Sequence, residues 1–127
     1  MTNCLLWFTV SLPVRPRRLA AYIAPSGRSP FKDWLVGLKD PEGLAAVYNR
    51  LDRLSEGNQG DFKRLGELLE FRIHTGPGYR VYAGEDGPTL VILLTGGDKT
   101  SQSKDIKQAQ RYWHDYQTRK TQAAASL

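Results

Sequence analysis

The sequence has almost none of the residues that build disulfides and thiolate metal sites. Its 127 residues include a single cysteine, Cys4, which excludes an internal disulfide and a cysteine cluster and favours a reducing cytoplasm. The two histidines, His74 and His114, have no paired spacing with each other or with carboxylates. We therefore expect no metal site and no cofactor.

Long hydrophobic runs are also missing. No stretch reaches the roughly 20 apolar residues that cross a bilayer. The apolar segment CLLWFTVSL is followed, not preceded, by basic residues, which is the reverse of a signal peptide. We expect no export and no membrane partner. Residues 1–17 are expected to be a flexible N-terminal extension or the product of an upstream start site.

Acidic residues are outnumbered. Eighteen Lys and Arg against 13 Asp and Glu give a formal net charge of +5 at pH 7. This balance favours an anionic partner such as nucleic acid. The length and the 40% hydrophobic content suit one domain, expected over residues 18–120, with a frayed tail at 121–127.

Caps and periodicity predict the first half of the fold. Residues 19–24 are expected to form a short strand. Ser-Pro at 29–30 and Asp-Pro at 40–41 each begin an amphipathic helix, and Gly-Asn at 57–58 ends the second one. We expect these helices to form an antiparallel hairpin with one apolar face.

The second half alternates with the period of a strand. LEFRIHT at 69–75 and YRVYA at 79–83 pair through a Pro-Gly turn, and TLVILLT at 89–95 follows a second turn. A last helix is predicted from Thr100 or Ser101. The fold class is therefore α+β, with helices packed on one face of a curved antiparallel sheet.

The opposite face of that sheet is expected to be open. Its side chains are Glu70, Arg72, His74, Arg80 and Tyr82. Lys99 joins them if the glycines at 96–97 bend the chain there. Close cations repel by about 1 kcal/mol or more unless an anion lies among them, and a polyphosphate backbone is the natural anion. The alternative is that the arginines merely lie on the solvent side of a sheet, paired with Glu70 or Asp98.

Four segments together resemble a known family: SPFKDWLVGLKD, RLDRLSEGNQGDFKRLG, ELLEFRIHTGPGYRVY and LVILLTGGDKTSQSKDIKQA. They are similar to the addiction-module killer proteins, a HigB-like branch of the RelE/ParE toxin superfamily, over about residues 18–118. The resemblance implies a RelE/ParE-like curved antiparallel sheet with an N-terminal helical hairpin and a C-terminal helix.

The same resemblance implies a function. The protein would be the toxin of a type II toxin-antitoxin system, a metal-independent, ribosome-dependent mRNA endoribonuclease that inhibits translation. Its partners would be the ribosome, mRNA and a cognate helix-turn-helix antitoxin. Two alternatives stay open: a ParE-like inhibitor of DNA gyrase, and a non-catalytic RNA-binding remnant.

Site residues follow from matching positions. Arg80 is expected at the scissile phosphate, Arg72 to stabilise charge and Lys99 to exchange a proton. The remaining expected RNA contacts are Tyr82, Gln102, Lys104 and Asp105. Among these, Tyr82 would stack on or orient a base.

Two residues of the last helix have more specific expected roles, and one family feature is missing. Asp105 would cap the helix or align Lys99, and Lys104 would contact RNA backbone or ribosomal RNA. Several RelE-like nucleases have a catalytic tyrosine near the position of Asp105, whereas this helix has none before Tyr112. His74 is either a general base or a bystander.

Overall fold

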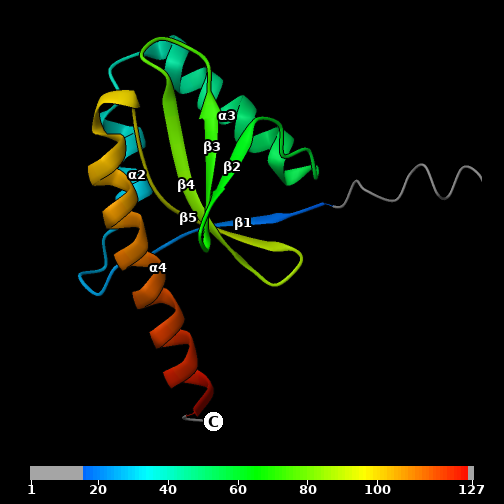
Figure 1. The fold of residues 1–127 in the computed structure, drawn as a ribbon, viewed down its shortest axis with the longest axis vertical. Coiled ribbons are helices and arrows are strands. Elements are labelled where there is room, and N and C mark those ends of the chain that lie inside the picture. Colours follow the sequence, from blue (N-terminus) through cyan, green and yellow to red (C-terminus); the bar gives the residue numbers. More distant parts are fainter. Residues whose placement is uncertain (1–15, 126–127) are drawn as a thin grey trace, which may run out of the picture.

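A five-stranded sheet lies between two layers of helices in the computed structural model, which describes residues 16–125 (Figure 1). The elements in chain order are β1 (Arg18–Ala21), α2 (Pro30–Gly37), α3 (Pro41–Ser55), β2 (Phe62–Leu65), β3 (Leu68–Ile73), β4 (Tyr79–Asp86), β5 (Leu90–Gly97), the 3-10 helix η1 (Lys99–Ser101) and α4 (Gln102–Ala125). The α+β class expected from the sequence is confirmed.

The predicted helix starts are confirmed at both caps. The Ser29 hydroxyl accepts a hydrogen bond from the Lys32 N–H at 3.3 Å, and the Asp40 carboxylate accepts one from the Gly43 N–H at 3.1 Å. Each cap satisfies a backbone donor that the first helical turn leaves free. Gly57, at φ 95°, follows the end of α3 in the left-handed conformation that the expected stop signal requires.

The sheet is mixed where an antiparallel one was expected, although the three strands predicted to pair in antiparallel fashion, β3, β4 and β5, do so. The strand order is β1-β5-β4-β3-β2, with β1 parallel to β5 and the other neighbours antiparallel. The sequence reading also missed β2. This strand is only four residues long and reads FKRL, with Lys63 and Arg64 exposed at the sheet edge, so it carries no apolar alternation to detect.

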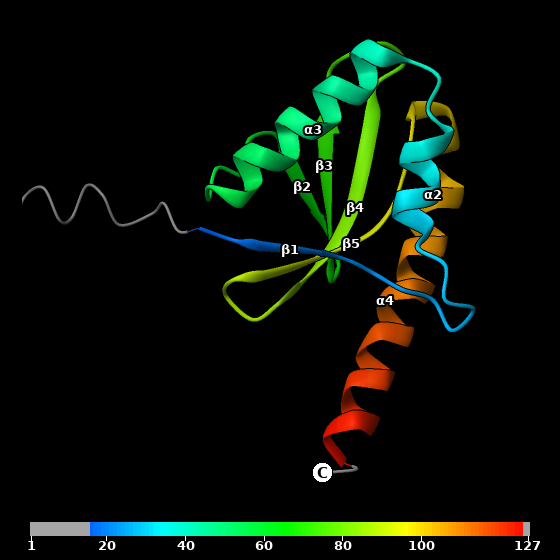
Figure 2. The same ribbon diagram turned by 180° about the vertical axis from the view of Figure 1, so that it is seen from behind.

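Helices cover both faces of the sheet, which corrects the expectation that they share one. One face, under α2 and α3, forms the larger core. The other face, under α4, forms a second core. On the first face α2 packs on β5 and α3 on β3, so the predicted helical hairpin diverges over the sheet (Figure 2).

Gly96 and Gly97 lie inside β5 without a positive φ, so the predicted bend at these glycines is wrong. A Cβ on Gly96 would overlap the Trp34 ring, and one on Gly97 would overlap the Asp105 carboxylate. Trp34 belongs to α2 and Asp105 to α4. The two glycines therefore let helices approach β5 closely from opposite faces.

The ends of the domain differ slightly from the expected boundaries. The Arg17 guanidinium donates a hydrogen bond to the Glu85 carboxylate at 2.9 Å, and the backbone N–H of Arg17 donates one to the Ser55 carbonyl at 2.8 Å. Arg17 therefore belongs to the folded unit. The rest of the expected extension, up to residue 15, lies outside the described residues. The expected tail is helical through Ala125. None of the described helices has the length and apolar character needed to cross a membrane.

Candidate nucleic-acid interface

The predicted catalytic residues Arg72, Arg80 and Lys99 come together in one open hollow of about 380 Å³. We call it the hairpin hollow, because it lies at the turn that joins β3 and β4. Its complete lining is Arg72, His74, Thr75, Gly76, Pro77, Gly78, Arg80 and Lys99.

The turn between β3 and β4 sets the spacing of these cations. Arg72 and Arg80 are direct cross-strand partners. Gly78, at φ 80°, has the left-handed conformation that the predicted turn requires of glycine. A Cβ at Gly78 would lie 3.8 Å from Arg80 Nη1 and 3.9 Å from the Lys99 Cβ, so the backbone here is close to both side chains. Arg80 Nη1 also donates to the Gly78 carbonyl at 3.1 Å.

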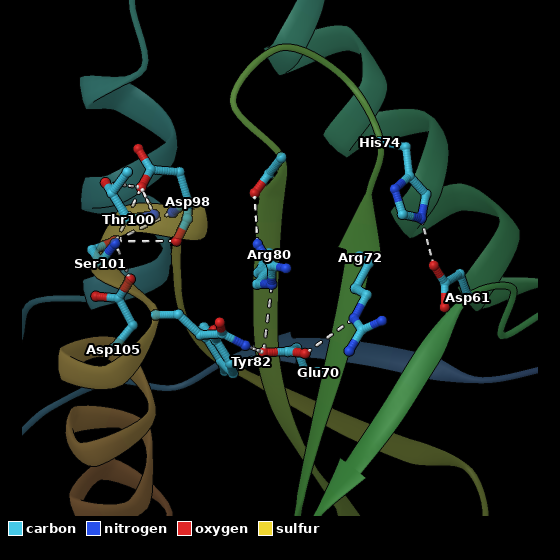
Figure 3. A network of polar contacts seen from close by, with 12 residues as sticks. Asp61, Glu70, Arg72, His74, Arg80, Tyr82, Asp98, Thr100, Ser101 and Asp105 are labelled. Carbon is cyan, nitrogen blue, oxygen red and sulfur yellow. Dashed lines mark hydrogen bonds and ion pairs between the residues drawn. The ribbon is translucent and has the colours of Figure 1, made fainter.

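A buried carboxylate lies beneath the arginines (Figure 3). Glu70 Oε1 accepts a hydrogen bond from Arg72 Nε at 3.2 Å, and Oε2 lies 3.7 Å from Arg80 Nε. Oε2 also accepts bonds from the Tyr82 hydroxyl at 3.0 Å and from the Gln102 amide at 2.8 Å. Glu70 therefore joins β3, β4 and α4 under the floor of the hollow.

Glu70 is ionised at neutral pH in spite of its burial. Burial alone raises the pKa of a carboxyl, but the hydrogen bonds from Gln102, Tyr82 and Arg72 and the charge of Arg80 outweigh it and hold the pKa of Glu70 below its usual value. The carboxylate orients the Arg72 guanidinium through a hydrogen bond and attracts that of Arg80, which the Gly78 carbonyl also holds. Three cations against one carboxylate leave the hollow positively charged.

The expected base-stacking role of Tyr82 is wrong, because its side chain is fully buried. Its ring lies under α4 in the second core, against the same helix face that carries Trp113. Burial, followed by the charge of Glu70, raises the pKa of its hydroxyl. Exposure on the predicted open face therefore increases towards the turn: Glu70 and Tyr82 are buried, the side chains of Arg80 and Arg72 are 13% and 33% exposed, and that of His74 is 74% exposed.

Asp105 also lies in the interior rather than at an RNA surface. It is 8% exposed and accepts a hydrogen bond from the Ser101 hydroxyl at 2.5 Å. The capping role expected of Asp105 belongs to Asp98, which accepts bonds from the backbone N–H groups of Thr100 and Ser101 at 2.9 and 3.3 Å. The bond from the Thr100 hydroxyl contributes most to holding the pKa of Asp98 below its usual value.

The other α4 residues lie away from the hollow. Gln102 is bound to Glu70 beneath it, and Lys104 is exposed on α4 but does not line it. Tyr112, the first tyrosine of the helix, stacks on Tyr22 with ring centroids 5.2 Å apart. It therefore takes no part in the hollow.

His74 is the residue that sequence reasoning undervalued. It lines the hairpin hollow, and its Nε2 lies 2.5 Å from the Asp61 carboxylate, with the other ring nitrogen facing away from Asp61 (Figure 3). The hydrogen bond from His74 lowers the pKa of Asp61. The available signal was the alternation that puts His74 on the same side of β3 as Arg72. Its partner comes from the start of β2, the strand that the sequence concealed.

The described part of the chain contains no group of three or more His, Cys, Asp or Glu side chains placed to hold a metal ion. The site therefore consists of fixed cations, one buried carboxylate and a histidine held by an aspartate. This set can bind a phosphate, stabilise charge that develops on it and move a proton.

The chain is similar in sequence to a known bacterial protein. No family model matches the chain. An uncharacterized protein of Haemophilus influenzae is 49% identical over 80 residues, which cover 62% of this chain and 81% of the relative. The chain belongs to the same family as this Haemophilus influenzae protein.

Proposed function

We propose that the protein is a RelE/ParE-like toxin that acts as a ribosome-dependent mRNA endoribonuclease in the cytoplasm. The observation that carries the proposal is the convergence of Arg72, Arg80 and Lys99 in the hairpin hollow. The motif resemblance to addiction-module killer proteins supports it. A helix-turn-helix antitoxin is the proposed inhibitor.

The proposed reaction is an internal transfer within the RNA. The 2′ oxygen attacks the adjacent phosphorus, the bond from phosphorus to the 5′ oxygen breaks, and a 2′,3′-cyclic phosphate and a free 5′ hydroxyl result. Negative charge grows on the non-bridging oxygens during the attack. Arg72 and Arg80, already oriented by Glu70, are placed to stabilise that charge. This chemistry does not call for a metal.

Two protons must move in this reaction. If His74 donates through Nε2 to Asp61, its other ring nitrogen is a free acceptor for the proton of the 2′ hydroxyl. Lys99, across the same hollow, is the proposed donor to the departing 5′ oxygen. In this proposal His74 accepts the proton in place of the catalytic tyrosine that several RelE-like nucleases have near the position of Asp105.

The remaining predicted contacts act outside the reacting centre. Lys104, exposed on α4, is the proposed contact to ribosomal RNA. Gln102 acts through Glu70 and so positions the arginines rather than touching RNA.

Induced expression of the chain alone in a bacterium tests the proposal. We expect growth arrest, with transcripts cut inside reading frames. Arg80→Ala combined with Lys99→Ala should restore growth while circular dichroism shows an intact fold. The matched control is Lys107→Ala with Arg111→Ala, two exposed α4 cations that should leave toxicity unchanged. A fully toxic Arg80/Lys99 variant, or intact transcripts with a DNA-damage response, would contradict the proposal.

A further inference from the structure

A second hollow of about 400 Å³ lies beside the first, between α3 and the end of β3. We call it the α3 hollow. The polar side chains that line it include three arginines and one carboxylate, and the set is Asn49, Arg50, Arg53, Asn58, Asp61, Arg72, His74 and Thr75. From the sequence alone, the polar α3 residues are expected to form a solvated helix face.

Arg50 is a buried cation without a carboxylate partner among the described residues. It is 6% exposed, and it donates to two backbone carbonyls, from Nη2 to Asp61 at 2.7 Å and from Nε to Arg72 at 3.5 Å. Its Nη1 has no hydrogen-bond partner. A buried guanidinium normally pairs with an anion, whereas Arg50 has these carbonyls, the Phe71 ring with its centroid 5.4 Å from Cζ, and the charge of Asp61 without an ion-pair contact.

A second arginine without an ion pair among the described residues lines the same hollow. Arg53 is exposed and forms no ion pair with any described residue. Burial lowers the pKa of Arg50, the charge of Arg53 lowers it further, and the charge of Asp61 raises it. Asp61 lines the same hollow and is already bound by His74. An anion in the hollow would offset the repulsion between the two arginines.

The two hollows are contiguous. Both are lined by Arg72, His74 and Thr75, so a chain that places a phosphate against Arg72 and Arg80 has the α3 hollow directly beside it. The lining combines polar side chains with the apolar Ala46 and Ile73, and its volume suits a single nucleotide rather than a folded partner. Asn49 and Asn58 offer both donors and acceptors, as base and sugar edges require.

We propose that the α3 hollow binds the nucleotide next to the scissile phosphate, with its phosphate at Arg53 and Arg50 and its sugar or base at Asn49 and Asn58. The inference rests on the proposed function only in that RNA occupies the hairpin hollow. It assigns an RNA-binding role to α3, and the proposed catalytic residues can act without it.

Binding of uncleavable RNA tests the proposal without any requirement for activity. The probes are fully 2′-O-methylated oligoribonucleotides of two and four nucleotides, measured by fluorescence anisotropy over a range of salt concentrations. Arg53→Gln should weaken the longer probe about threefold or more and leave the shorter probe unchanged. Loss of one phosphate contact should also reduce the salt slope for the longer probe by about 0.7.

One control variant and a second variant of the α3 hollow separate this site from general charge effects. Arg111→Gln removes an exposed arginine of α4 that lines neither hollow, and it should leave both probes unchanged. Asn49→Asp adds a negative charge to the α3 hollow without touching a buried group, and it should weaken the longer probe alone. Equal losses for Arg53→Gln and Arg111→Gln, or no loss in either hollow variant, would overturn the inference.

The two proposals fail separately. If the wild type binds both probes with the expected difference but cuts no transcript, the nuclease proposal fails and the subsite stands. If transcripts are cut and Arg53→Gln changes neither affinity nor salt slope, only the subsite fails.

Discussion

Arg72 and Arg80 lie directly opposite each other across β3 and β4, a register in which like charges normally destabilise a sheet. The pair is tolerated because the buried carboxylate of Glu70 lies 3.2 Å from Arg72 Nε and 3.7 Å from Arg80 Nε. The single carboxylate neutralises only part of the positive charge of the two arginines, so the pair still attracts anions. Their alignment is therefore built into the fold before any ligand arrives.

Replacing the buried carboxylate by an amide should cost stability in a pH-dependent way. We expect Glu70→Gln to lower the free energy of unfolding by about 1–3 kcal/mol at pH 7, because two guanidiniums lose a charged acceptor. The folded pKa of Glu70 is below its ordinary 4.5, so this contribution is complete above about pH 4.5 and is lost as the pH falls through the folded pKa. Urea unfolding at pH 7 and pH 3 should show the difference from wild type shrinking in acid.

The exposed Glu67, in the turn before β3, provides the matched control for this experiment. Glu67→Gln should change stability little at either pH. A Glu70→Gln difference that stays constant between pH 7 and pH 3 would show that the charge of Glu70 is not what stabilises the pair.

Tyr82 should matter for stability and not for RNA. Tyr82→Phe removes a hydrogen bond to Glu70 but keeps the buried ring, so we expect a loss of about 0.5–1.5 kcal/mol in unfolding free energy. Toxicity at a temperature where the variant is folded should remain close to wild type. If the folded Tyr82→Phe variant no longer arrested growth, a direct contact between Tyr82 and RNA would be indicated.

His74 should control the pH dependence of cleavage. As the proposed proton acceptor, His74 should make the wild-type cleavage rate depend on pH. His74→Asn should reduce single-turnover cleavage on programmed ribosomes by about 10²- to 10⁴-fold and remove that pH dependence. His114→Asn, at an exposed α4 position, should do neither. A rate profile that keeps its shape in His74→Asn would assign proton transfer to another group.

The glycine pair at the end of β5 should be intolerant of side chains. Gly96→Ala and Gly97→Ala should each destabilise the fold by about 1–3 kcal/mol, because the new methyl groups collide with Trp34 and Asp105. Gly37→Ala is the control, since a Cβ there meets nothing within 4 Å and the position lies in α2. It should be neutral or slightly stabilising in thermal unfolding. Equal effects at all three positions would exclude close packing as the reason for the pair.

Local signals in the sequence predicted the local structure well. The two caps at Ser29 and Asp40 begin helices as expected, and the glycine turns join β3 to β4 and β4 to β5. The sequence also predicted that Arg72 and Arg80 are neighbours. These features depend on hydrogen bonds and backbone angles within a few residues, which the order of amino acids fixes directly.

Partners distant in the sequence were harder to predict. Nothing in the alternation of β4 indicates that α4 covers Tyr82, because a buried tyrosine that bonds Glu70 and an exposed one occupy the same strand position. The contact between His74 and Asp61 depends on β2, a short charged strand without a detectable period. In both cases the sequence does not show which elements of the fold pack against each other.

The amino-acid sequence by itself determined the caps, the turns, the arginine pair and the excess of positive charge, since each follows from residue type and near-neighbour spacing. Only the tertiary structure decided which of those charges remain exposed. Packing α4 against the sheet buries Tyr82 and Glu70, because the helix lies over the row of Thr95, Tyr82 and Glu70. In the next row towards the turn it contacts Gly97 and leaves the side chains of Arg80 and Arg72 13% and 33% exposed.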